Sequence, residues 1–293
     1  MNTEQTNLAA IDIGSNAARI LIKSVEKTEK GLRTKKLQFL RIPIRLGIDV
    51  FTNGKISEER KEMLTRTMKV FHQLLILYNV KQYRACATSA LRDAKNGKKI
   101  LKSVAKATKI DIEIISGDEE ARTIRDNYSG TGNLLYMDVG GGSTEVSLVC
   151  DGKLVGSRSV NIGTLRILNE CVSPAIWQEL ADSVKQLTDG VSNVRIVGSG
   201  GNINKLHRLA PKKERTKESL TVSTLSSLYK RLSALNVEQR MLEFDLRPSR
   251  ADVIVPAAQL FLMVASIVKA DTILVPTVGL ADGIINEMLE NMQ

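Results

Sequence analysis

The sequence predicts a mixed α/β protein built from two similar halves, each with a partly parallel sheet. Residues 8–44 and 134–161 each contain three consecutive apolar runs separated by short turns, and helices alternating with strands follow in both halves. In each half the first run ends in an Asp that a Gly- and Ser-containing turn follows. The chain has 293 residues, which is enough for two domains of ordinary size.

The first half begins with strands at 8–13, 18–25 and 32–44, and a break at 27–31 indicates a hairpin. A helix is expected over 57–79, because Ser57 can cap it, two glutamates lie in its first turn, and apolar residues recur at helical spacing. The remaining expected elements are helices at 98–108 and 117–128 and strands at 84–88 and 111–116.

The second half repeats this order after a Gly-containing hinge candidate at 129–132. Asp151-Gly152 between two apolar runs is a strong two-residue hairpin signal. The uncharged stretch 253–268 is too short to span a bilayer, so we expect a buried helix there. The expected strands are 134–139, 145–151, 153–161, 195–198 and 272–275, and the other expected helices are 173–188, 223–235 and 281–291.

The composition limits the classes of function. Hydrophobic content of 43% and charged content of 25% are typical of a globular protein without a membrane partner, and the first residues carry no secretory signal. Three cysteines without CxxC spacing fit reduced thiols in a cytoplasm, and two isolated histidines disfavour histidine metal sites and triads. The net charge of +10 agrees in sign with a phosphate-rich ligand, although basic runs are more often simply solvated. Interleaved aromatic residues and nucleic-acid-binding motifs are missing, so no nucleic-acid partner is expected.

Two related turns carry most of the functional signal. They are Asp12–Asn16 and Asp138–Glu145, and both follow an apolar strand. Glycine lets backbone N–H groups approach an anion closely, and an Asp at the strand end can hold a cation beside that anion. Two such turns in two similar half-molecules predict that both bind one phosphorylated ligand. A single turn of this kind would be an ordinary tight hairpin.

Blocks along nearly the whole chain resemble the exopolyphosphatase/guanosine pentaphosphatase (Ppx/GppA) family in its two-domain short form. The blocks, in the order of the family, are IDIGSNAARILI, ATSALRDAKN, EIISGDEEAR, MDVGGGSTEV, VGSGGNINKL, RPSRADVIVPA and VPTVGLADGI. The resemblance implies two actin-like (ribonuclease H-like, ASKHA) domains around a central cleft. It implies an N-terminal domain over 1–130, a second domain over 131–280, and a last helix, 281–293, that packs back on the first domain.

The resemblance assigns the catalytic base to Glu120, the second of two adjacent glutamates. Without the resemblance, this segment would read as an ordinary helix start with acids in its first turn. Asp12, Asp138 and Glu145 are the candidate ligands of Mg²⁺, which prefers oxygen donors and keeps several waters. We expect Asp12 and Asp138 to end equivalent strands and to face each other across the cleft.

The candidate phosphate-binding groups lie in the two turns and on two arginines. Arginine binds phosphate through two parallel hydrogen bonds and stays charged. For Arg19, a surface strand position is an equally good interpretation, and for the glycines a plain hairpin is the alternative. The candidates are Gly14, Ser15, Asn16, Arg19, Arg92, Gly140, Gly141, Gly142, Ser143 and Thr144.

The resulting hypothesis is a Mg²⁺-dependent hydrolase that releases the terminal phosphate of inorganic polyphosphate or of guanosine pentaphosphate, which would place it in the stringent response. The alternatives are an actin-like kinase or ATPase and a sensor of these molecules without turnover. A P-loop enzyme is disfavoured because GxxxxGK[ST] does not occur. The loop 198–202 resembles an adenosine-side loop, but Asn202 stands where family members commonly have Thr. The resemblance also allows a homodimer.

Overall fold

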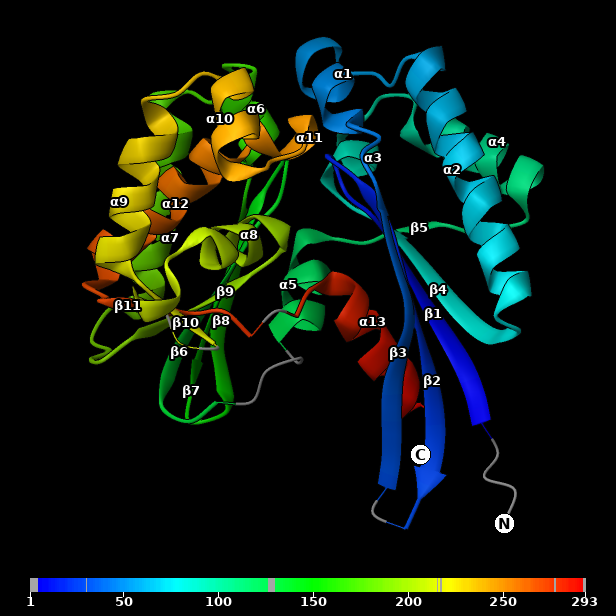
Figure 1. The fold of residues 1–293 in the computed structure, drawn as a ribbon, viewed down its shortest axis with the longest axis horizontal. Coiled ribbons are helices and arrows are strands. Elements are labelled where there is room, and N and C mark those ends of the chain that lie inside the picture. The colour runs from blue at the N-terminus through cyan, green and yellow to red at the C-terminus, as the bar shows by residue number, and fades with distance from the viewer. Residues whose placement is uncertain are drawn as a thin grey trace. The chain divides into compact units, whose positions relative to one another are not determined.

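The computed structural model describes residues 5–29, 31–125, 130–214, 216, 218–276 and 278–291. The chain forms two compact units, which are described separately here (Figure 1). Unit 1 comprises Met1–Ser116 and Leu280–Gln293, and unit 2 comprises Gly117–Gly279. The chain therefore passes from unit 1 to unit 2 between Ser116 and Gly117.

Unit 1 contains a five-stranded sheet in the order β3-β2-β1-β4-β5. The first three strands are antiparallel neighbours, whereas β1, β4 and β5 are parallel. One face of the sheet packs on α2 and α4 through a core that includes Ile11, Ile20, Phe71 and Val104. The strands are β1 (Gln5–Ile13), β2 (Ala18–Thr28), β3 (Gly31–Ile42), β4 (Val80–Ala87) and β5 (Glu113–Ile114), and the helices are α1 (Leu46–Asn53), α2 (Glu58–Leu77), α3 (Ser89–Asp93), α4 (Gly97–Thr108) and α13 (Leu280–Glu290).

Unit 2 contains a six-stranded sheet in the order β10-β11-β9-β6-β7-β8. Its hairpin β7–β8 turns at Asp151 and Gly152, both with positive φ, as the sequence predicts. The strands are β6 (Asn133–Val139), β7 (Thr144–Cys150), β8 (Lys153–Val160), β9 (Arg195–Ser199), β10 (Ser219–Thr221) and β11 (Thr272–Leu274), and the helices are α5 (Gly117–Arg125), α6 (Thr164–Leu168), α7 (Pro174–Thr188), α8 (Gly201–Leu209), α9 (Val222–Ser233), α10 (Val237–Phe244), α11 (Pro248–Ala251) and α12 (Ile254–Val268), with a 3₁₀ turn at Lys212–Glu214.

The two sheets repeat one topology. The order β3-β2-β1-β4-β5 in unit 1 corresponds to β8-β7-β6-β9-β11 in unit 2, with the same pattern of antiparallel and parallel neighbours. Each fifth strand is followed by a helix that packs in the other unit: α5 contacts β7 and β8, and α13 contacts β1 and β2. The expected packing of the last helix on the first sheet is thus seen for Leu280–Glu290, through ion pairs of Lys23 with Asp282 and of Arg84 with Glu287.

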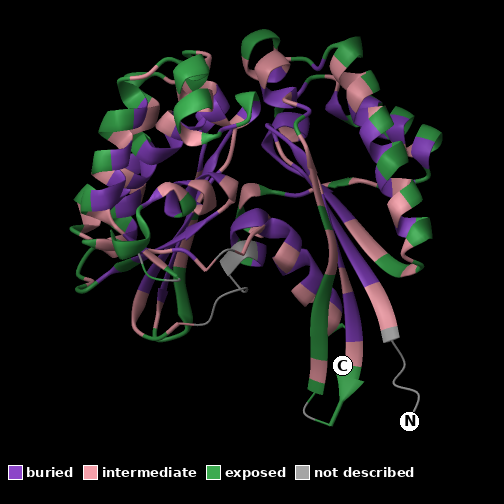
Figure 2. Cartoon of the chain, in the orientation of Figure 1, coloured by how far each residue is buried: buried purple, intermediate pink, exposed green. Residues whose placement is uncertain are grey.

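Helix α12 is the central helix of unit 2. It packs on α7, α8 and α9, and its residues Ile254, Leu260, Phe261 and Val264 are fully buried, as expected for the apolar stretch 253–268. Among the described residues, the segment Pro248–Val268, which joins α11 and α12, is 21 residues long with a mean hydropathy of 2.0, which meets the length and composition of a membrane span. Its burial in the core explains that hydropathy. Figure 2 shows buried residues along the inner strands and on the sheet-facing sides of the helices, whereas β3 is half-buried or exposed along its length.

Candidate active site

The acidic site of unit 2 lies at the paired ends of strands β6 and β7. Asp138, the penultimate residue of β6, lies directly opposite Glu145 on β7 and beside Ser199 on β9. Paired residues share one face of a sheet, so the two carboxylates point to the same side. Gly200, with φ +92°, follows Ser199, and a Cβ built on it would lie 2.5 Å from Asp138 Oδ1. Glycine is therefore needed there on two grounds, its φ and the close approach of the carboxylate.

Helix α5 adds a third carboxylate to this face. Glu120, in the first turn of α5, is buried, whereas its neighbour Glu119 is half-buried. One oxygen each from Glu120, Asp138 and Glu145 lies within 4.8 Å of the other two. At such separations, two unit charges repel by roughly 3–4 kcal/mol at an effective dielectric constant of about 20. Three carboxylates held together in this way need a cation or a proton.

The donor set fits a hard divalent cation. All three ligand atoms are carboxylate oxygens, which suit Mg²⁺, Mn²⁺ or Ca²⁺ rather than the nitrogen- and sulfur-rich sites of zinc. Mg²⁺ commonly takes one or two protein carboxylates and completes its shell with water and substrate phosphate. Asp138 and Glu145 together supply two such carboxylates, and Glu120 lies beside them. Among the described residues, these three form a group that could hold a metal ion.

The turn between β6 and β7 is held by its own carbonyl groups. Thr164 N–H donates to the Gly140 carbonyl at 3.0 Å, and Leu165 N–H donates to the Gly141 carbonyl at 2.8 Å. A Cβ on Gly163 would lie 2.6 Å from Gly141, so α6 begins directly on the turn. These bonds fix the backbone of the turn, and the Gly140 N–H is itself donated to the Ser143 carbonyl at 3.0 Å, so the N–H groups of the residues that follow Gly140 are the ones predicted to meet phosphate.

Side-chain hydrogen bonds within unit 2 also hold this turn. Arg166 Nε donates to the Gly142 carbonyl at 2.7 Å. The Thr144 hydroxyl donates to the Ile162 carbonyl at 2.6 Å and the side chain is fully buried, so this proton is committed to the fold. Ser143 is also buried. The phosphate-binding role of these residues stays a prediction, and for Thr144 it would require the bond to Ile162 to be exchanged.

The corresponding strand ends of unit 1 carry a different pair. Asp12 lies opposite Arg19, and the two side chains form an ion pair in which the Asp12 side chain is 6% exposed and that of Arg19 is 26% exposed. Gly14 packs against this ion pair, since a Cβ built on it would lie 3.6 Å from Arg19 Nη1 and 3.9 Å from Asp12 Oδ1. On the other side of Asp12 lies Cys86, whose thiol pKa is raised well above its ordinary value by burial and which therefore stays neutral.

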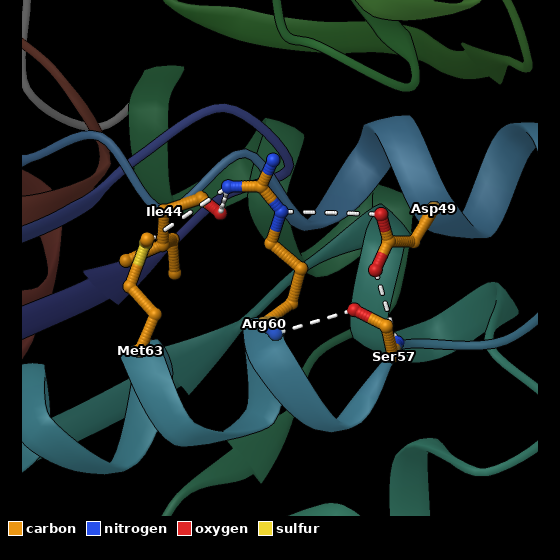
Figure 3. Close-up of polar contacts among 5 residues, drawn as sticks. All are labelled: Ile44, Asp49, Ser57, Arg60 and Met63. Atoms are coloured by element: carbon orange, nitrogen blue, oxygen red, sulfur yellow. Dashed lines mark hydrogen bonds and ion pairs between the residues drawn. The ribbon is translucent and has the colours of Figure 1, made fainter.

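The β1–β2 turn is braced by α1 and α3. Gly47 N–H donates to the Ser15 carbonyl at 2.9 Å, and the Ser15 and Ser89 hydroxyls share a hydrogen bond of 2.8 Å. The segment before Gly47 is held in turn by Arg60, whose Nη1 donates to the Ile44 carbonyl at 3.2 Å (Figure 3).

Arg60 is itself anchored at the start of α2. Its N–H donates to the Ser57 hydroxyl at 3.2 Å, which confirms Ser57 as the N-cap, and its Nε lies 3.9 Å from Asp49 Oδ1. Asp49 also accepts from Ser57 N–H at 2.9 Å. Sequence reasoning missed this bracing network because its members come from three separate segments.

The other sequence-predicted residues have local partners. Arg92 Nη1, on α3, donates to the Ile115 carbonyl at 2.9 Å, next to the end of β5. At the start of α8, Asn202 Oδ1 accepts from Arg250, and a Cβ on Gly201 would lie 2.9 Å from Arg250 Nη2. Arg250 lies in the block RPSRADVIVPA and was not predicted as a site residue, because its contact with the start of α8 joins residues that are 48 positions apart in the sequence.

The comparisons with known proteins identify the family. The model of the Ppx/GppA phosphatase family matches residues 25–292. The chain belongs to this family. A solved Ppx/GppA family member from Aquifex aeolicus is 26% identical and aligns with a TM-score of 0.76 over 99% of both chains. The Ppx/GppA relatives of known structure have the two-domain actin-like (ASKHA) fold, and this chain shares it.

Two curated relatives extend the comparison. The Ppx/GppA chain is 27% identical to exopolyphosphatase 2 of Mycobacterium tuberculosis over 288 residues, which cover 85% of this chain and 86% of that protein. It is 37% identical to the bifunctional 3-dehydroquinate synthase/phosphatase of Fusobacterium nucleatum over 174 residues, which cover 54% of this chain. The match spans only 25% of the Fusobacterium protein.

Proposed function

We propose that the protein is a phosphohydrolase that releases the terminal phosphate of inorganic polyphosphate, of guanosine pentaphosphate, or of both. The observation that carries this proposal is the group of Glu120, Asp138 and Glu145, whose oxygens lie within 4.8 Å of one another on unit 2. Family membership and the similarity to a mycobacterial exopolyphosphatase support the choice of substrate class.

In the proposed reaction, Glu120 accepts a proton from a water molecule whose oxygen attacks the terminal phosphorus. A new P–O bond forms to the water oxygen as the bridging P–O bond breaks. The electron pair of that bond stays on the bridging oxygen, which becomes a terminal oxygen of the shortened chain, and the attacked phosphoryl group is released as orthophosphate. Glu120 is buried in the first turn of α5, which holds its carboxylate in place for this task, and the positive end of the helix dipole lies beside it.

Asp138 and Glu145 would hold the divalent cation, for which we propose Mg²⁺. When bound, the ion supplies positive charge that offsets the charge on the phosphate oxygens and removes the repulsion among the three carboxylates. The Asp12 carboxylate already forms an ion pair with Arg19. We therefore assign Asp138 and Glu145 the main part of the cation site.

The remaining predicted residues would bind the polyanion. The backbone N–H groups of Ser15, Asn16 and Gly141–Ser143 would approach phosphate oxygens, and Arg19 and Arg92 would supply charge. The N–H groups of Gly14 and Gly140 are already donated to the Ala17 and Ser143 carbonyls, so these two glycines would shape the turns. Domain closure around the substrate, a homodimer and a cytoplasmic location remain expectations from the sequence and from the family resemblance.

Phosphate release from polyphosphate, guanosine pentaphosphate and ATP, each supplied separately with Mg²⁺, tests the proposal. Glu120→Gln removes the base and should lower the rate on the first two substrates by about 10²–10⁴-fold. Glu119→Gln is the matched control, since this half-buried neighbour on the same helix turn lies outside the acidic group, and it should retain most of the activity.

Equal activity of the two variants would contradict the role of Glu120. Phosphoryl transfer from ATP to an added acceptor would favour an actin-like kinase, and binding of polyphosphate without turnover would favour a sensor.

A further inference from the structure

A serine on β8, the strand next to β7, contacts one carboxylate of the acidic site. Ser159 lies opposite Glu145 in the β7–β8 pair, and its hydroxyl donates to Glu145 Oε1 at 2.9 Å. We propose that Ser159 is a positioning residue, which orients the Glu145 carboxylate for the divalent cation and sets its place relative to Glu120. The proposal rests on the cation site proposed above.

The same serine also contacts the helix that carries Glu120. A Cβ built on Gly117, the first residue of α5, would lie 2.4 Å from Ser159 Oγ and 2.5 Å from Ser159 Cβ. A real Cβ cannot approach that closely, so α5 begins directly against Ser159 and requires glycine there. Ser159 is thus the side chain that touches both the Glu145 carboxylate and the start of the Glu120 helix.

This contact has a physical consequence for metal binding. A Glu side chain has three rotatable bonds, and a carboxylate that must be ordered on binding a cation loses that freedom at the expense of affinity. A hydrogen bond from a neighbouring hydroxyl orders the carboxylate beforehand. Removing a residue that hydrogen-bonds to a metal ligand typically lowers the affinity for the metal by 10–100-fold. We expect the low end of that range, because a neutral hydroxyl donates here.

The strand pair contains its own control. Two residues along, the Ser157 and Ser147 hydroxyls form a hydrogen bond of 2.8 Å on the same face of the same two strands. Ser157 and Ser159 are both half-buried. Ser157→Ala therefore removes a comparable hydroxyl and hydrogen bond without touching the Glu145 carboxylate.

Calorimetric titration of the full chain with Mn²⁺, without substrate, tests the proposal by binding rather than activity. Ser159→Ala should weaken Mn²⁺ binding by about tenfold, whereas Ser157→Ala should match the unsubstituted protein. Gly117→Ala should also weaken binding, because the new methyl group must displace Ser159. In phosphate-release assays Ser159→Ala should raise the Mg²⁺ concentration needed for half-maximal rate more than it lowers the rate at saturating Mg²⁺.

Glu145→Gln separates the two levels of the argument. If Glu145→Gln loses Mn²⁺ binding and Ser159→Ala binds as tightly as Ser157→Ala, the positioning role is wrong and the cation site stands. If Glu145→Gln binds Mn²⁺ like the unsubstituted protein, the cation site itself is wrong. A thermal unfolding curve for each variant shows that it is folded, so that lost binding is not lost structure.

Discussion

The first hairpin of each unit has the same backbone arrangement, but the two hairpins carry different charges. In both, the Asp on the first strand lies seven residues before its partner on the second, and the third residue of the turn segment, Gly14 or Gly140, donates its N–H to the carbonyl of Ala17 or Ser143. The partner of Asp12 is Arg19, whereas the partner of Asp138 is Glu145.

This one difference separates two kinds of chemistry. In unit 1, Asp12 and Arg19 neutralise each other, so the strand ends need no cation. In unit 2, Asp138 and Glu145 repel each other, and Glu120 on α5 adds to the repulsion. A duplicated scaffold thus offers a neutral, arginine-containing end suited to anions and an acidic end suited to a cation. A phosphoanhydride bound with a divalent cation presents both requirements.

The largest loss of activity is expected when Glu145 of unit 2 is replaced by arginine, the residue at the equivalent position, Arg19, of unit 1. In Glu145→Arg, the new guanidinium can pair with Asp138 as Arg19 pairs with Asp12, so that position no longer favours a divalent cation. We expect Mn²⁺ binding to be lost. Mg²⁺-dependent phosphate release should fall by at least about 10²-fold, because the cation that offsets the charge of the phosphate oxygens no longer binds. Measurable Mn²⁺ binding by this variant would show that the two strand ends are not distinguished by this residue.

A smaller effect is expected from breaking the pair in unit 1. Arg19→Met keeps much of the side-chain volume but leaves the buried Asp12 carboxylate without this guanidinium, which should lower the free energy of unfolding by about 1–3 kcal/mol. Urea unfolding measures the change. Asp12→Asn should cost less, because the more exposed Arg19 can turn to water. Equal stability of Arg19→Met and the unsubstituted protein would mean that the pair does not contribute to folding.

Local signals in the sequence were enough for the regular elements. The three leading strands of each half, the Ser57-capped helix and the Asp151-Gly152 hairpin are confirmed, because each depends on alternation, spacing or a turn residue within one segment. The strand expected at 111–116 is only two residues long, since β5 pairs with β4 at Cys86 and Ala87 alone. Part of the helix expected at 117–128 lies outside the described residues. The short helices α1, α3, α6, α8, α10 and α11 were not predicted, because periodicity is weak over few turns.

The site shows a similar division. Motif resemblance brought Glu120, Asp138 and Glu145 into one hypothesis, and the structure brings their oxygens together on unit 2. What the motifs could not show was pairing between strands. The ion pair of Asp12 with Arg19 and the hydrogen bond of Ser159 with Glu145 depend on register, and a register is set by the folded sheet rather than by one segment. The assignment of Gly117 and Glu120 to unit 2, after a strand of unit 1, likewise depends on tertiary contacts.

The central claim is that the divalent cation binds at Asp138 and Glu145, and anomalous diffraction from Glu120→Gln crystals soaked in Mn²⁺ tests it most directly. This variant should turn substrate over slowly while both proposed ligands remain. We predict an anomalous peak about 2.1 Å from carboxylate oxygens of Asp138 and Glu145. A fully occupied peak elsewhere, with none between these two side chains, would contradict the account.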